Sequence, residues 1–172
     1  MEIKKRIKMP IILELPEIIE LSEYNGNIHN YMNAIYEVFR RDFVLSKPNF
    51  KGKRLGLKKF PLVAGKEYTF YHFTHDGKNE NDREPNLRRM ERMPFPRPMI
   101  DCSNCESLRV WRVKRGSKER ILIFHEEESY LVVLEDRGSY ILPWTAYLVE
   151  YPNKRRRLIK EYEAYISAEA AQ

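Results

Sequence analysis

Apolar and polar residues follow a helical spacing near the beginning of the chain. Six apolar residues recur at intervals of one helical turn: Ile28, Tyr31, Met32, Ile35, Val38 and Phe39. This pattern predicts a helix over residues 28–44, which Asn25 or Asn27 can cap. Between Ile11 and Leu21, apolar and acidic residues alternate without a clean period, so we expect a short helix or an arm there.

The middle of the chain changes pattern within a few residues. Residues 67–73 are rich in Tyr, Thr and Phe and predict a strand, and the polar residues 75–84 that follow predict a loop. Pro85 is suited to the first turn of a helix, so we expect a short helix over residues 86–93. Prolines at positions 94, 96 and 98 predict that this helix stops and that an extended connector follows.

The remainder of the chain has the pattern of strands followed by one helix. Segments rich in β-branched and aromatic residues predict strands over residues 108–113, 120–125, 130–134 and 140–149. The connections between them are short, which favours an antiparallel meander. Pro143 lies inside the last of these strands and indicates an edge strand or a bulge. Apolar residues at helical spacing predict a closing helix over residues 153–169.

Together these elements predict an α+β fold: one or more N-terminal helices, a four- to five-stranded antiparallel sheet and a C-terminal helix. A chain of 172 residues has the size of one domain. We therefore expect an N-terminal arm over residues 1–27 and a single α+β domain over residues 28–172.

The charge of the chain is modestly basic and unevenly distributed. The net charge is +6 and 12% of the residues are aromatic, which is compatible with nucleic-acid binding and equally with an ordinary basic surface. Basic residues gather at positions 51–59, 83–97, 109–120 and 154–157. The seven glycines form no phosphate-binding loop motif, which argues against a nucleotide-binding fold of that kind.

Hydropathy and cysteine content bear on the location of the protein. The apolar runs are too short to cross a bilayer and the first residues lack the pattern of a signal peptide, so we expect no membrane contact. Two cysteines without such a signal indicate a reducing cytoplasm. Cys102 and Cys105 have the spacing of half a zinc site, but the sequence offers no second pair of ligands. We expect two loop thiols without a partner, no metal and no cofactor.

His72 is the first of four histidines to be considered for chemistry. His72 and His75 lie at the end of the predicted strand, beside the polar loop. An imidazole in that position can act as a general acid or base near neutral pH. The alternative is a partly buried histidine bonded to a backbone carbonyl. His29 and His125 are expected to be structural.

A cluster of arginines follows this histidine along the chain. Its members are Arg83, Arg88, Arg89, Arg92 and Arg97. On a helix Arg88 and Arg92 share one face, and guanidinium groups match phosphate oxygens bidentately. The alternative is a solvated helix face whose arginines pair with Glu84 and Glu91. Position favours a site, because only the polar loop separates the cluster from His72.

Hydroxyl, aromatic and further basic side chains complete the set of candidates. Thr145 and Tyr147 point to the same face of the last predicted strand, where they can hold a phosphate or a reacting 2′-hydroxyl. Ordinary strand composition is the alternative. Trp111 is a candidate for base stacking or for the core. Lys53 and Arg54, in the basic segment 51–59, are candidates for phosphate binding.

Eight stretches of the chain carry a resemblance to a known family. They are Gly52–Leu57, Pro61–Lys66, the segment ending at His72, Arg83–Arg92, Pro96–Pro98, Tyr130–Leu134, Trp144–Tyr147 and Arg155–Tyr165. In this combination the chain resembles a small prokaryotic and phage-related family of the barnase–EndoU–colicin–RelE nuclease superfamily. The resemblance covers about residues 28–165, and Arg83–Arg92 and Trp144–Tyr147 are its most specific parts.

The resemblance implies a toxin-like or phage-defence-related endoribonuclease that cleaves RNA without a metal. In this chemistry the 2′-hydroxyl attacks the adjacent phosphate and leaves a 2′,3′-cyclic phosphate. The resemblance assigns the acid–base role to His72, phosphate stabilisation to Arg88, Arg89 or Arg92, positioning to Thr145, and orientation or proton donation to Tyr147. Its partners would be RNA and a neutralising antitoxin or immunity protein. A non-catalytic RNA- or DNA-binding module and a protein-interaction domain are the alternatives.

Overall fold

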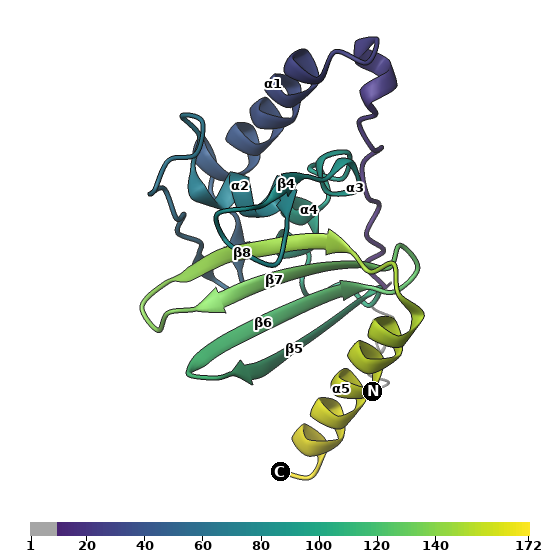
Figure 1. Cartoon of the computed structure of the whole chain (residues 1–172). Coiled ribbons are helices and arrows are strands. Elements are labelled where there is room, and N and C mark those ends of the chain that lie inside the picture. The colour runs from purple at the N-terminus through teal and green to yellow at the C-terminus, as the bar shows by residue number, and fades with distance from the viewer. Residues whose placement is uncertain (1–9) are drawn as a thin grey trace, which may run out of the picture.

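Residues 10–172 are described by this computed structural model, in which a four-stranded antiparallel sheet is covered by helices on both faces (Figure 1). Helices α1 to α4 lie on one side of the sheet, and the C-terminal helix α5 extends from the end of β8 along the other (Figure 1). The expected α+β class is confirmed. Residues 1–9 of the expected N-terminal arm lie outside the described residues.

The described part of the arm lies against the helical side of the molecule. Residues 10–20 have no regular structure and lead into a 3-10 turn, η1 (Leu21–Tyr24). Leu13, Leu15 and Ile18 pack against the core, and the Ile19 amide donates to the carbonyl of Glu91 at 2.9 Å. Of the two expectations for this segment, the structure confirms the arm.

Helix α1 (Ile28–Phe39) continues as a π-helical segment, η2 (Arg40–Val44), so the expected helix over residues 28–44 is confirmed. The Asn27 side chain caps it by accepting a hydrogen bond from the Asn30 amide at 3.0 Å. Tyr31, Ile35 and Phe39 form its buried stripe, as the helical spacing of its apolar residues requires.

The basic segment that follows forms a small hairpin and then joins the sheet. Strands β1 (Asn49–Phe50) and β2 (Lys53–Arg54) pair with each other. Leu55 then bridges to Ile141, and the Gly56 amide donates to the Ile141 carbonyl at 2.7 Å. A Cβ atom at Gly56 would lie 3.2 Å from the Tyr140 ring, so glycine allows this close approach.

The strand predicted over residues 67–73 is wrong, because these residues form helix α2 (Tyr68–Thr74). All seven residues of α2 are buried. A helix that is covered on every side needs no polar face, so its sequence shows no helical period. Its tyrosines, phenylalanines and threonines are residues that strands also favour, and tertiary packing overrides that preference here.

Two further predictions for the middle of the chain need correction. Strands β3 (His75–Asp76) and β4 (Glu84–Pro85) pair across the polar loop, so Pro85 ends a strand, and α3 spans only Leu87–Met90. The expected extended connector is instead helix α4 (Pro96–Asp101). Prolines fit the first turn of a helix because the amides there have no intrahelical partner.

The predicted meander is confirmed, with strand order β5-β6-β7-β8. Its strands are β5 (Leu108–Arg115), β6 (Lys118–His125), β7 (Tyr130–Asp136) and β8 (Ile141–Leu148). Strand β8 is an edge of the sheet, and its register shifts so that Val133 pairs with Thr145 while Leu134 pairs with Pro143. Trp144 is the extra residue of this bulge, as Pro143 in an edge strand suggests.

Alternation along the strands divides the core into two layers. Ile121 and Ile123 pack with the residues of α1 and α4, whereas Leu122 and Phe124 pack with Leu158 of helix α5 (Pro152–Ala170). The closing helix over residues 153–169 is therefore confirmed, and it covers the second face of the sheet.

The two cysteines lie where α4 turns towards the sheet. Cys102 ends α4, and the Cys105 amide donates to its carbonyl at 2.9 Å. This tight turn brings their Cα atoms to 5.4 Å, and the structure joins them in a disulfide. The expectation of two thiols without a partner is therefore wrong.

Candidate functional site

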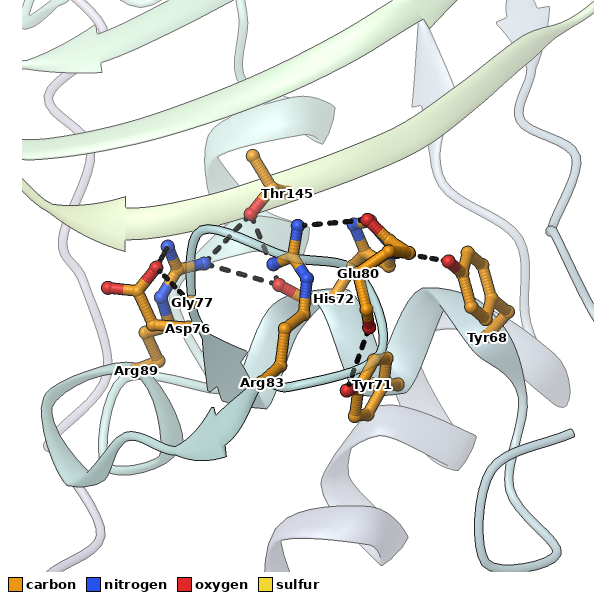
Figure 2. A network of polar contacts seen from close by, with 9 residues as sticks. All are labelled: Tyr68, Tyr71, His72, Asp76, Gly77, Glu80, Arg83, Arg89 and Thr145. Atoms are coloured by element: carbon orange, nitrogen blue, oxygen red, sulfur yellow. Dashed lines mark hydrogen bonds and ion pairs between the residues drawn. The ribbon is translucent and has the colours of Figure 1, made fainter.

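The C-terminal half of β8 meets α2, α3 and the loop 77–83, and three of the candidate residues converge there (Figure 2). Arg89 Nη1 donates to the Thr145 hydroxyl at 2.9 Å and to the His72 backbone carbonyl at 3.2 Å. The Thr145 hydroxyl donates to the same carbonyl at 3.2 Å. His72, Arg89 and Thr145, from three different elements, therefore belong to one site.

The imidazole of His72 lies at the centre of a cluster of ionisable side chains. Its Nε2 atom is hydrogen-bonded to the carboxylate of Glu80, which also accepts a hydrogen bond from the Tyr68 hydroxyl (Figure 2). Arg83 pairs with the second Glu80 oxygen at 3.3 Å. The His72 ring is 5.2 Å from the Trp144 ring and is only 3% exposed. We call these five residues the His72 cluster.

Burial and charge set the protonation of this cluster. Burial, together with the positive charge of Arg83, lowers the pKa of His72, although contact with Glu80 acts in the opposite direction. Burial alone would raise the pKa of Glu80, but hydrogen bonds from Tyr68 and His72 and the charge of Arg83 lower it overall. At neutral pH the cluster therefore holds a neutral imidazole beside an ionised carboxylate, a pair that can move a proton.

Arg89 is held by the protein itself. The residue is 8% exposed, and besides its two bonds at the site it donates to the Ala146 carbonyl at 3.4 Å and contacts Asp76 at 3.4 Å. Its guanidinium lies 5.0 Å from the centre of the Tyr147 ring. Arg89 thus joins α3 to β8 and fixes the positions of Thr145 and Tyr147.

The other arginines of the cluster separate in space. Arg88 is exposed and pairs with Glu91, which also pairs with Arg92. Arg97 points away, towards Asp101 and the Asp42 carbonyl. The expected solvated and paired helix face describes Arg88, whereas Arg92 is paired but its side chain is only 14% exposed.

A small hollow of about 210 Å³ adjoins the arginines of α3. Asp76, Arg88, Arg89, Tyr147 and Lys154 are among its lining residues. Tyr147 therefore has access to solvent beside two arginines and a lysine, as a group that positions an anion requires.

Three candidate residues lie elsewhere. Lys53 and Arg54 are exposed on the β1–β2 hairpin, and Lys53 reaches the Gly138 carbonyl in the β7–β8 turn, at the end of β8 opposite Thr145. Trp111 is 1% exposed and donates to Glu161 at 2.9 Å, so it belongs to the core beneath α5 and does not stack on a base.

Sequence reasoning missed several residues of the site. Glu80 and Tyr68 belong to the His72 cluster, and Lys58 Nζ lies 4.2 Å from the Tyr68 ring. Glu80 could have been suspected because it lies in the polar loop between His72 and Arg83. No sequence pattern places Lys58 beside Tyr68, because only the fold brings Lys58 next to α2.

Residues 10–172 offer neither a candidate metal site nor a helix that could cross a membrane. The described residues contain no group of three or more His, Cys, Asp or Glu side chains placed to hold a metal ion. None of the helices in that range combines the length and apolar character that crossing a membrane needs.

Similarity to known proteins assigns no function to this site. No protein-family model matches the chain, and it has no significant match among curated proteins or solved structures.

Proposed function

We propose that the chain is a metal-independent endoribonuclease that cleaves RNA by attack of the 2′-hydroxyl on the adjacent phosphate. The observation that carries this proposal is the pairing of a neutral His72 imidazole with Glu80 among Tyr68, Arg83 and Lys58. This set combines a proton acceptor with cationic and neutral hydrogen-bond donors, which are the groups that phosphate transesterification needs.

The carboxylate of Glu80 takes the position in which a substrate phosphate fits. Its oxygens contact Tyr68, His72 and Arg83, the kinds of donor that also bind phosphate. The Glu80 side chain is about half exposed, on a loop at the surface. We infer that an incoming phosphate displaces this carboxylate and thereby frees His72 Nε2.

The proposed reaction then proceeds with balanced proton transfers. While Nε2 is bonded to the Glu80 carboxylate, it carries the single proton of the neutral imidazole. Once Glu80 is displaced, exchange with water moves that proton to Nδ1, and Nε2 then accepts the 2′-hydroxyl proton as the 2′-oxygen bonds to phosphorus. The bond from phosphorus to the 5′-oxygen breaks, and the Tyr147 hydroxyl gives that oxygen a proton. Arg83 and Lys58 stabilise the charge that develops on the phosphate. The products are a 2′,3′-cyclic phosphate and a 5′-hydroxyl.

The cellular role proposed with this activity is that of a toxin-like or phage-defence-related enzyme in the cytoplasm. A ribonuclease that acts on the RNA of its own cell requires control, so the proposal includes a neutralising antitoxin or immunity protein. Expression with and without neighbouring genes tests this part: growth arrest only in their absence supports it.

A non-catalytic nucleic-acid-binding module is the second candidate. The burial of His72 and the many bonds of Arg89 within the protein favour it, because both side chains already have structural roles. The two candidates predict the same affinity for RNA and differ only in whether RNA is cut.

The test is incubation of purified protein with transfer or messenger RNA in EDTA, followed by analysis of the new ends. The proposal predicts 2′,3′-cyclic phosphate and 5′-hydroxyl ends. Intact RNA, or ends of another kind, would contradict it.

A further inference from the structure

A groove lies between the sheet, the edge strand β8 and the first turns of α5. Helix α5 covers this face of the sheet only in part (Figure 1). Its volume is about 350 Å³. Its polar walls consist of Arg115, Arg120, Thr145, Tyr147, Lys154 and Arg157. Among the described residues that line it, four are basic and none is acidic. We call it the α5 groove.

The start of α5 is built against the usual preference of a helix. Pro152 suits the first position of a helix, but Tyr151 provides no side-chain cap, and the first turn holds no acidic residue. Instead Lys154, Arg155, Arg156 and Arg157 follow one another directly. The positive end of the helix dipole disfavours cations there. Within this run Arg155 pairs with Glu126, and Arg156 donates to the Asn153 side chain. An anion bound beside Lys154 and Arg157 would offset the remaining repulsion.

The cations of the groove differ in how far they are already paired. Arg115 pairs with Glu161, and Arg120 with the buried Glu135. Within residues 10–172, Lys154 and Arg157 are in no ion pair with a carboxylate. Lys154 Nζ lies 4.3 Å from the centre of the Tyr147 ring. The two uncompensated charges therefore face the hydroxyl-bearing strand.

Arg120 lies in the wall of the groove, and Glu135 compensates its charge. Its guanidinium lies 4.1 Å from the Trp144 ring centre, and its side chain is only 13% exposed. Burial lowers its pKa, and its Nη1 atom is buried without a hydrogen-bond acceptor in the described structure. Because that atom has almost no contact with solvent, Arg120 shapes the wall of the groove beside Trp144, and the charges open to an anion are those of Lys154 and Arg157.

We propose that the α5 groove binds the phosphodiester backbone of single-stranded RNA and leads the strand to the His72 cluster. This deepens the proposed ribonuclease function and rests on it for the direction of the strand. Tyr147 and Lys154 also line the hollow beside Arg88 and Arg89, so the two cavities are adjacent. Trp144 connects the groove to His72, because its ring contacts both Arg120 and His72.

The floor of the groove favours a single strand over a duplex. Val133 and the rings of Trp144 and Tyr147, which are half-buried, form part of it. Unpaired bases can lie on such an apolar surface while their phosphates meet the cations at the rim. A duplex keeps its bases stacked inside, and the apolar floor would then contact nothing complementary.

Affinity measurements with the full chain test this proposal. The probe is a fluorescent single-stranded 2′-O-methyl RNA, which cannot undergo transesterification. The double variant Lys154→Gln/Arg157→Gln removes both groove charges. Arg156→Gln/Lys160→Gln removes two exposed charges from the same helix outside the groove, and is the matched control.

We expect about tenfold weaker binding for the groove variant at moderate salt, and a slope of log affinity against log salt reduced by about 1.4. We expect less than about a twofold change for the control. Equal losses in both variants, no loss in either, or tighter binding of a duplex than of the single strand would overturn the proposal.

The cleavage assay in EDTA separates this result from the proposed function. Selective loss of affinity without any cleavage by the wild-type protein would retain the groove and reject the ribonuclease. Cleavage together with unchanged affinity of the groove variant would retain the ribonuclease and reject the groove.

Discussion

The His72 cluster and the α5 groove both lie at the β8 edge of the sheet, but they differ in whether their charges are compensated by ion pairs within the protein. In the cluster, Glu80 is bonded to His72 and Tyr68 and paired with Arg83, so its charges compensate one another. In the groove, Lys154 and Arg157 face no carboxylate among the lining residues. The difference indicates that proton transfer belongs to the first region and anion binding to the second.

The two regions also differ in how they are supported. The buried helix α2 and the buried Arg89 support the cluster from inside the protein. The groove depends on the exposed start of α5. Substitutions in the first region should therefore affect chemistry or stability, and substitutions in the second should affect affinity. Separate measurements of cleavage, unfolding and binding can break or sharpen this division.

The largest expected effect is on cleavage, from the substitution His72→Ala. Removing the proton acceptor should lower the cleavage rate at least about a hundredfold, while the affinity for 2′-O-methyl RNA stays within about twofold. His29→Ala is the control, because His29 is exposed on the first turn of α1. Cleavage by His72→Ala at the wild-type rate would remove His72 from the mechanism.

The next effect is on stability, from the substitution Arg89→Ala. This change removes one of the two donors to the buried His72 carbonyl and the Arg89 donor to the Ala146 carbonyl, so we expect a loss of about 2–3 kcal/mol in the free energy of unfolding in urea. Arg88→Ala removes an exposed neighbour and should cost less than about 0.5 kcal/mol. Equal stability of the two variants would show that Arg89 does not hold α3 to β8.

A smaller effect is expected from Glu80→Gln, because Glu80 occupies the proposed phosphate position. Removing its negative charge should strengthen binding of 2′-O-methyl RNA by about threefold. Asp82→Gln, on the same exposed loop, is the control. Weaker binding by Glu80→Gln would mean that the carboxylate does not compete with substrate.

The smallest effect concerns pH. The pKa of His72 is lowered by burial, so its base form persists at neutral pH and the cleavage rate should fall only below about pH 6.5. Glu80 acts to raise this pKa, so Glu80→Gln should move the acid limb of the pH–rate profile to still lower pH. A limb that moves to higher pH would contradict the assignment of His72.

The sequence predicted the elements that have either a helical period or clear polar boundaries. Strands β6 and β7 are buried on both faces, but they are runs of β-branched and aromatic residues between short polar turns, and α5 shows a helical period. Helix α2 is buried all round and was predicted as a strand. The prolines of α4 suggested an extended connector because sequence alone does not show that they lie in the first turn of a helix.

The sequence identified some members of the candidate site, missed others and assigned few of the roles. His72, Arg89 and Thr145 converge, yet Arg89 is occupied by the protein and Arg88 is the exposed one. Pairings that depend on tertiary structure, such as Glu80 with His72 and Arg120 with Trp144, left no local pattern. The basic run Lys154–Arg157 was visible, but its position beside Thr145 and Tyr147 was not.

The central claim is that the His72 cluster cleaves RNA by 2′-hydroxyl attack. The most direct test is a time course of end-group analysis on one RNA in EDTA, with the wild-type chain and His72→Ala side by side. The account predicts that 2′,3′-cyclic phosphate ends accumulate with the wild-type chain and stay at background with the variant. Absence of cyclic phosphate from the wild-type reaction, or equal accumulation in both, would contradict it.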